Sequence, residues 1–171
     1  MQGINHGWGW ITTRLRTTHS GMSEVKTPIP EGFTSHWDAQ AGLRIVEASA
    51  EIVVAEYMVE EKHHQPYGIV HGGVHCSAVE TVCSIGAGMS AMERGTASGA
   101  VGLENHTSFV RAVRSGKVRV VATPLTRGSR TQLWQAESRD EEGRLIAHGK
   151  VRALCLQDGT VLAGKSFEGQ E

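Results

Sequence analysis

The sequence predicts an α+β fold in which an antiparallel sheet covers one long helix. Residues 71–93 form a run of mostly small and apolar residues, and its length and few β-branched side chains favour a helix over a strand. Beyond it, the segments 100–111, 117–128, 131–140 and 144–156 show the two-residue period of strands. A twisted antiparallel sheet must bury its apolar face, and a helix rich in Gly and Ala lets the sheet wrap closely around it.

The other elements complete this arrangement. Residues 33–40 predict a short helix, and residues 43–59, enriched in Val, Ile and Tyr, predict two strands or one long bent strand. Short separators at 115–116, 128–129 and 141–143 are typical of hairpin turns. The last three strands should therefore form an antiparallel meander.

The composition is that of one soluble globular domain. The chain has 171 residues, of which 39% are hydrophobic and 20% charged, and its net charge is −1. This balance argues against a nucleic-acid partner and gives no support for a membrane one. The three cysteines have no zinc spacing and are typical of reduced thiols, so we expect a cytoplasmic protein.

Three parts can be distinguished along the chain. Residues 1–25 are rich in Gly, Thr and His without an apolar signal segment, and we expect a poorly ordered extension there. Residues 26–160 contain all the predicted strands and the long helix, and form the domain. Residues 161–171 are expected to be a C-terminal tail.

Glu80 is the single charged residue in the predicted helix between positions 72 and 92. Burying a carboxylate is costly unless it has partners or a task. It is either a structural carboxylate held by Ser77, Ser84 or His75, or a general base or nucleophile in a water-poor cleft. A charge at this point also argues against reading the segment as a membrane span.

Gly72 and Gly73 stand where the helix begins. They either make a tight turn or expose backbone N–H groups that could polarise a carbonyl, since the first N–H groups of a helix lack partners. Gly72 and Glu80 are eight residues apart, about 12 Å along a helix. One chain cannot easily bring both to one carbon, so shared sites in a two-fold dimer are expected.

The histidines at the helix entrance raise the question of a metal. His71 and His75 are four residues apart, and His63 and His64 lie nearby. The chain has no HExxH motif and no cysteine pair at zinc spacing, so we expect neither metal nor cofactor. His71 is better interpreted as a donor to a substrate carbonyl or as a helix cap.

The stretch QPYGIVHGGVHCSAVET, residues 65–81, resembles the hotdog-fold acyl-CoA thioesterases. The similarity is greatest to the branch with phenylacetate-pathway, 1,4-dihydroxy-2-naphthoyl-CoA and enterobactin-proofreading thioesterases. That branch reads Q-P-[FY]-G-x-x-H-G-G followed by A-E-[ST]. The resemblance covers roughly residues 40–156, and it implies a hotdog fold, an antiparallel sheet wrapped around one long central helix.

The resemblance also implies roles for individual residues. Glu80 would be the catalytic carboxylate, and the Gly72 N–H of the partner subunit would polarise the thioester carbonyl. His71 would help to bind that oxygen, Gln65 would position the water or the substrate, and Ser84 would assist the leaving thiolate or the water. Thr81 stands where the branch has Ser or Thr and is assigned to the substrate.

Two further segments would bind coenzyme A. They match the nucleotide and pantetheine contacts of the family and comprise Phe109, Val110, Arg111, Ala112, Thr126, Arg127, Gly128, Ser129, Arg130 and Thr131. Among them Arg111, Arg127 and Arg130 are candidates for phosphate, because guanidinium pairs well with phosphate.

The resemblance thus predicts hydrolysis of a thioester, of an aromatic acid in some members, by a homodimer that pairs into a tetramer. The alternative is a non-catalytic acyl-CoA-binding protein of the same fold. One departure concerns the acyl group: members acting on aromatic groups often read E-x-N-A-x-H, whereas this chain reads ENHTSF, with Phe109 in place of the histidine and a histidine at His106. We expect the pocket depth to depend on Trp134, Met89, Phe109 and residues 94–99.

Overall fold

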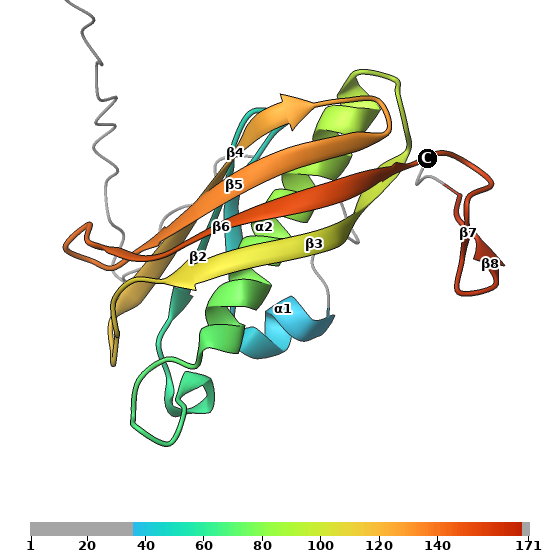
Figure 1. The fold of residues 1–171 in the computed structure, drawn as a ribbon. Helices are drawn as coiled ribbons and strands as arrows, with labels where there is room; N and C mark the ends of the chain where they lie inside the picture. The colour runs from blue at the N-terminus through green and yellow to red at the C-terminus, as the bar shows by residue number, and fades with distance from the viewer. Residues whose placement is uncertain (1–35, 169–171) are drawn as a thin grey trace, which may run out of the picture.

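The computed structural model describes residues 36–168, and the extension expected over residues 1–25 lies outside this range. Figure 1 shows one long helix behind a curved sheet. The helical elements are α1 (His36–Ala41), the 3-10 helix η1 (Glu61–His63) and α2 (Gly72–Glu93). The strands are β1 (Arg44–Ala48), β2 (Val53–Met58), β3 (Gly99–Phe109), β4 (Lys117–Arg127), β5 (Thr131–Arg139), β6 (Leu145–Leu156), β7 (Val161–Leu162) and β8 (Lys165–Ser166).

The predicted long helix is confirmed as α2. It begins after His71, whose extended backbone and side chain cap the first turn. It ends at Glu93 and is followed by the capping residue Arg94 and by Gly95, whose φ of +61° is a left-handed conformation that glycine adopts without strain. The end of the small-residue run and this glycine together stop the helix where the sequence indicates.

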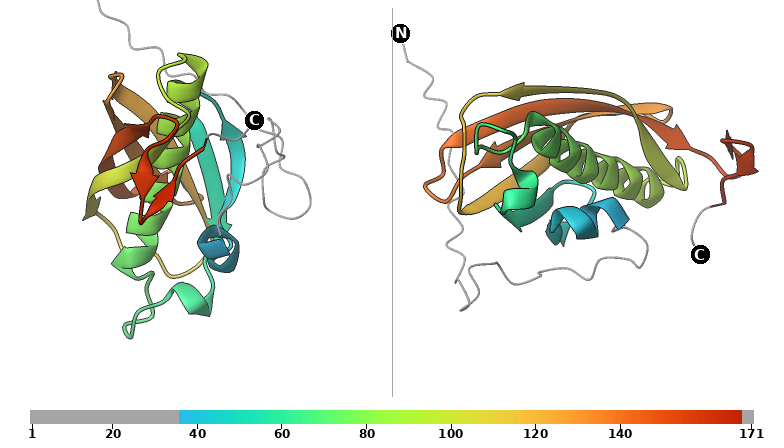
Figure 2. Two further views of the ribbon diagram at one scale, coloured as in Figure 1. Left: turned by 90° about the vertical axis from the view of Figure 1, so that its right-hand side faces the viewer. Right: turned by 90° about the horizontal axis from the view of Figure 1, so that it is seen from below.

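The six main strands form one antiparallel sheet in the order β1-β2-β4-β5-β6-β3. The meander predicted for β4, β5 and β6 is confirmed, and residues 43–59 form two strands rather than one. The strand that directly follows the helix, β3, pairs with β6 and lies at one edge. In Figure 2 the sheet curves over α2, and α1 lies beside α2.

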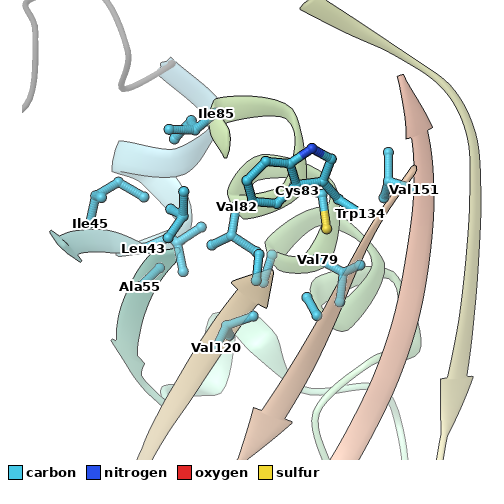
Figure 3. Close-up of a cluster of buried hydrophobic side chains, with 14 of the residues drawn as sticks. Leu43, Ile45, Ala55, Val79, Val82, Cys83, Ile85, Val120, Trp134 and Val151 are labelled. Carbon is cyan, nitrogen blue, oxygen red and sulfur yellow. The ribbon is translucent and has the colours of Figure 1, made fainter. Parts of the chain in front are cut away.

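The core lies between the sheet and α2, as Figure 3 shows. Trp134 is fully buried and its ring lies on Gly86, where a side chain would overlap the indole. The indole N–H donates to Gln132 Oε1 at 3.0 Å, and Gln132 Nε2 donates to Ala87 O at 3.1 Å. Trp134 therefore fixes the sheet to the helix, and the expectation that it sets pocket depth is wrong.

The C-terminal residues contain structure that the sequence did not predict. β7 and β8 form a small hairpin within the expected tail. In Figures 1 and 2 this hairpin extends from the end of the molecule where α2 ends and β3 begins. Within the described part of the chain, no helix combines the length and the apolar character that crossing a membrane requires.

Candidate active site

Glu80 lies on the face of α2 that meets β3, and each of its carboxylate oxygens accepts one hydrogen bond. Ser84 Oγ donates to Oε1 at 3.0 Å from one turn further along the helix. Asn105 Nδ2 donates to Oε2 at 3.0 Å from β3. Of the three partners considered from the sequence, Ser84 is the one that holds the carboxylate, while Ser77 donates to Gly73 O at 2.9 Å within its own helix.

Asn105 is the site residue that sequence reasoning missed. Its Nδ2 also donates to Cys76 O at 3.0 Å, and its Oδ1 accepts from Thr107 Oγ1 at 2.6 Å. These contacts use both amide protons and fix which way the amide faces. An Asn in the middle of a strand is disfavoured by β-propensity, and this is the signal that could have indicated its role.

Gly102 leaves the space that the Glu80 carboxylate occupies. A side chain at Gly102 would overlap Glu80 Oε1, and its Cβ would lie 2.9 Å from the carboxyl carbon. The pairing of β3 with β6 also shifts register between Gly102 and Glu104. A glycine beside an irregularity in the ladder is typical of a strand that approaches a functional group closely.

Glu80 also affects its buried neighbour Cys83. Burial, and after it the negative charge of Glu80, raises the pKa of the Cys83 thiol. A thiol needs to ionise to act as a nucleophile. Cys83 therefore stays protonated, and Glu80 is the chemically competent group of this half of the helix.

The start of α2 forms the other half of the candidate site. His71 Nδ1 accepts from Gly73 N at 2.8 Å, which confirms the capping role. Because Nδ1 is the acceptor, the neutral ring carries its proton on Nε2, which is free to donate outward. Within residues 36–168, no acceptor is hydrogen-bonded to the Gly72 N–H.

A cavity of about 420 Å³ opens at this end of the helix. Its wall brings together three predicted catalytic residues and the first predicted coenzyme A segment, namely Gln65, His71, Gly72, Phe109, Val110, Arg111 and Ala112. The Phe109 ring lies against Gly72, so closely that a Cβ there would be 2.6 Å from a ring carbon. The chain thus places residues 109–112 beside the Gly72 N–H.

His75 lines the same cavity but is only 3% exposed, and its ring centroid is 6.1 Å from that of Phe109. Burial lowers the pKa of His75 to about 4, so the ring is neutral at physiological pH. Its Nδ1 is buried and has no partner among the described residues. His75 is thus a neutral aromatic wall next to Gly72.

The remaining histidines near the helix are used structurally. His63 Nδ1 accepts from the Glu60 N–H at 2.9 Å, and His63 Nε2 contacts Ala41 O at 2.7 Å. His64 Nε2 contacts Arg114 O at 2.9 Å. Within residues 36–168, no three His, Cys, Asp or Glu side chains are grouped as metal ligands would be.

The second predicted coenzyme A segment lies elsewhere. Residues 126–131 connect β4 and β5, and Arg127 forms an ion pair with Glu51 and donates to Ala50 O. Arg94, at the end of α2, donates to Arg127 O, so this segment is near the opposite end of α2 from Gly72. Thr81 donates to Asp38 Oδ1 at 2.7 Å and thus faces α1 rather than β3.

In one chain, therefore, the Gly72 cavity and the Glu80 carboxylate are separate half-sites, joined by two turns of α2. Each half offers one part of an acyl-transfer reaction, since the first has hydrogen-bond donors without an acceptor among residues 36–168 and the second has an oriented carboxylate.

Comparisons with known proteins decide the family. The model of the thioesterase superfamily matches residues 67–147. A protein of Mycobacterium tuberculosis that is provisionally named an esterase is 37% identical over 131 residues, which is 77% of this chain and 94% of the relative. The 1,4-dihydroxy-2-naphthoyl-CoA hydrolase of Escherichia coli is 35% identical over 114 residues, covering 67% of this chain and 82% of the relative.

This chain belongs to the thioesterase superfamily. The solved structure of the M. tuberculosis protein has a TM-score of 0.69 and 36% identity, and the match covers 72% of this chain and 98% of that one. A Haemophilus influenzae thioesterase gives a TM-score of 0.67 at 27% identity, over 80% and 96% of the two chains. The predicted hotdog fold is thereby confirmed, and the superfamily identifies this chain as a thioester hydrolase.

Proposed function

We propose that the chain is an acyl-CoA thioesterase in which Glu80 carries the chemistry. The observation that supports this best is a half-buried carboxylate with one donor on each oxygen, placed over a glycine that leaves room for it. Glu80 either takes a proton from the water that attacks the thioester carbonyl or attacks that carbon itself. In the second route water then hydrolyses the mixed anhydride, and both routes give the free acid and coenzyme A.

The Gly72 N–H of the partner subunit is the proposed donor to the carbonyl oxygen. Two observations support a shared site. Gly72 lies about 12 Å along the helix from Glu80 of its own chain, and β3 is an edge strand whose Leu103 is 53% exposed. Open edges tend to pair with another strand, and two-fold pairing of β3 would bring Gly72 of one copy to Glu80 of the other.

The rest of the substrate would extend along the Gly72 cavity. His71 can donate through Nε2 to the thioester oxygen, and Gln65 lines the same wall. Arg111, also on this wall, is the proposed partner of a coenzyme A phosphate. Residues 126–131 and Thr81 are also proposed to contact the substrate. In this loop, Arg130 is the proposed partner of a coenzyme A phosphate. Pairing of dimers into a tetramer, a cytoplasmic location and the absence of a cofactor belong to the same proposal.

Relatives support the choice of a coenzyme A ester. One is named a 1,4-dihydroxy-2-naphthoyl-CoA hydrolase, and the Klebsiella pneumoniae relative at 37% identity is named a proofreading thioesterase. Phe109 stands where members that act on aromatic groups often have a histidine. We therefore place no specific aromatic acid in the site.

A thiol-release assay over aromatic and aliphatic acyl-CoAs tests the proposal. We expect hydrolysis of at least one ester, with loss of turnover in Glu80→Ala. Tight binding of these esters without any turnover would instead establish a non-catalytic acyl-CoA-binding protein. A single turnover in ¹⁸O-labelled water tests the nucleophilic role: an unlabelled product acid with label in Glu80 establishes attack by Glu80 followed by addition of water to the Glu80 carboxyl carbon, whereas general-base catalysis puts the solvent oxygen into the product.

A further inference from the structure

A second cavity lies beside Glu80, on the side away from Gly72. It has a volume of about 320 Å³ and lies between the C-terminal half of α2, the start of β3 and the C-terminal residues. None of the described residues that form its wall is charged, and its large side chains are Ile85, Met92, Val101, Leu156, Leu162 and Phe167. An ionised group would lose its hydration there without gaining a partner.

Two elements independently place this cavity next to the Glu80 carboxylate. On α2, Ser84 lines the cavity and also donates to Glu80 Oε1 at 3.0 Å. On β3, Val101 lines the cavity, and the next residue, Gly102, lies directly beneath that same oxygen. The cavity therefore begins at Ser84, whose hydroxyl is hydrogen-bonded to Glu80 Oε1.

The β7–β8 hairpin supplies the outer wall through Leu162 and Phe167. The Phe167 N–H donates to Thr160 O at 2.7 Å, and Phe167 O accepts from Gly159 N at 2.9 Å, so the hairpin is closed at its base. The Phe167 ring lies against Gly99, where a Cβ would be 2.8 Å from the ring. This hairpin lies beyond residues 67–147, the part that matches the superfamily model.

We propose that this cavity holds the acyl group of the substrate and that the hairpin sets its length. The substrate class is then a thioester of an uncharged, apolar acid of about ten carbons, since 320 Å³ equals the liquid volume of about ten water molecules and a methylene group is about as large as a water molecule. The inference rests on the proposed role of Glu80 because the scissile carbonyl must lie at that carboxylate. Each additional methylene that enters the cavity should strengthen binding about fourfold.

Two variants of opposite effect test the proposal. Ala100→Leu fills the cavity from β3, and Phe167→Ala removes its outer wall. With saturated acyl-CoAs of increasing length, Ala100→Leu should lower kcat/KM for decanoyl-CoA relative to butyryl-CoA by about tenfold or more. Phe167→Ala should move the optimum to longer chains. The control is Val161→Ala in the same hairpin, which is 65% exposed and should keep the wild-type profile.

Binding of thioether analogues, which cannot be hydrolysed, gives a second readout that does not need turnover. By calorimetry the wild type should bind S-decyl-CoA about 10³-fold more tightly than S-butyl-CoA, because six more methylenes enter the cavity at about fourfold each, and Ala100→Leu should remove most of this preference. An unchanged chain-length profile and unchanged thioether preference in both variants would overturn the proposal while leaving acyl-CoA hydrolysis intact. A preference for S-decyl-CoA that Ala100→Leu removes, without any hydrolysis, would support the cavity and reject the enzymatic function.

Discussion

The two halves of α2 differ in how their polar groups are used. At the Glu80 half, Ser84 and Asn105 each donate a hydrogen bond to the Glu80 carboxylate. At the Gly72 half, the first N–H of the helix faces a cavity without an acceptor from the described residues, and the His71 cap directs its own remaining donor outward.

This difference indicates how the catalytic groups are divided between the two halves of α2. The carboxylate half is preorganised by its own chain, because Asn105 and Ser84 orient Glu80 before any ligand arrives. The glycine half is prepared to donate, but the described residues offer it no acceptor. A thioester bound between two such halves would supply the missing acceptor to one and the electrophilic carbon to the other.

Removal of the Glu80 charge should have the largest effect. Glu80→Gln keeps the size of the side chain but cannot act as a base, and we expect kcat to fall by about 10³-fold. The measurement is thiol release at saturating substrate, with circular dichroism to confirm the fold. Ser77→Ala is the matched control, because Ser77 lies on the same helix and bonds only its own backbone at Gly73. Comparable losses in the two variants would contradict the assignment.

Gly102→Ala should displace the carboxylate without removing it. The added methyl would occupy the position of Glu80 Oε1, and misplacement of a reacting group by about 1 Å can cost about 10²-fold in rate. We expect kcat to fall by about that factor. A double-mutant cycle provides the control: in the Glu80→Ala background the same substitution should have no further effect on kcat. An additional loss there would show that Gly102 acts through something other than Glu80.

Asn105→Ala should have a smaller effect, because Ser84 still holds one oxygen. Glu80 Oε2 would lose its donor, and we expect kcat to fall about tenfold, in the range of one charge-assisted hydrogen bond. Thr107→Val, which removes only the group that orients the amide, should change kcat less. A wild-type rate in Asn105→Ala would exclude a positioning role.

The buried, neutral ring of His75 predicts that the stability of the fold depends on pH. Its pKa falls from 6.5 in the unfolded chain to about 4 in the fold, so between these values the unfolded chain binds the extra proton. Stability therefore rises with pH across this window and is lost as the pH falls through it. We expect His75 to cost about 2 kcal/mol between pH 7.5 and 5. Urea denaturation of the wild type and His75→Leu should show a smaller loss in the variant, and equal losses would contradict the buried neutral ring.

The sequence contained enough to predict α2 and the strand meander. The hydrophobic periods and turn residues that predict these elements lie within short stretches of the sequence. The order of strands is not local: β3 lies at the edge beside β6 because the sheet must close over α2, and no spacing along the chain encodes that neighbour. The same holds for Trp134, which we expected to affect pocket depth but which packs in the core against Gly86.

The residues of the candidate site likewise differ in how well the sequence predicts them. Glu80 could be found because a single charge within an apolar helix is recognisable from the sequence alone. Asn105 gave only a weak signal, as a residue of low β-propensity within a strand, and its contact with Glu80, like that of Gly102, arises only where β3 crosses α2. The β7–β8 hairpin is made of short segments with a left-handed Ala163 and Gly164 between them, which gives too little periodicity to predict strands.

The most direct test of shared sites is complementation between two inactive chains. One chain carries Glu80→Ala and the other Gly72→Pro, which removes the N–H at a helix position that tolerates proline. Gly72→Ala is the control, because it keeps the N–H and imposes the same contact with Phe109. Each heterodimer would contain one intact site, so random mixing should restore about a quarter of wild-type activity. No recovery in heterodimers isolated by two different tags would contradict a site built from two subunits.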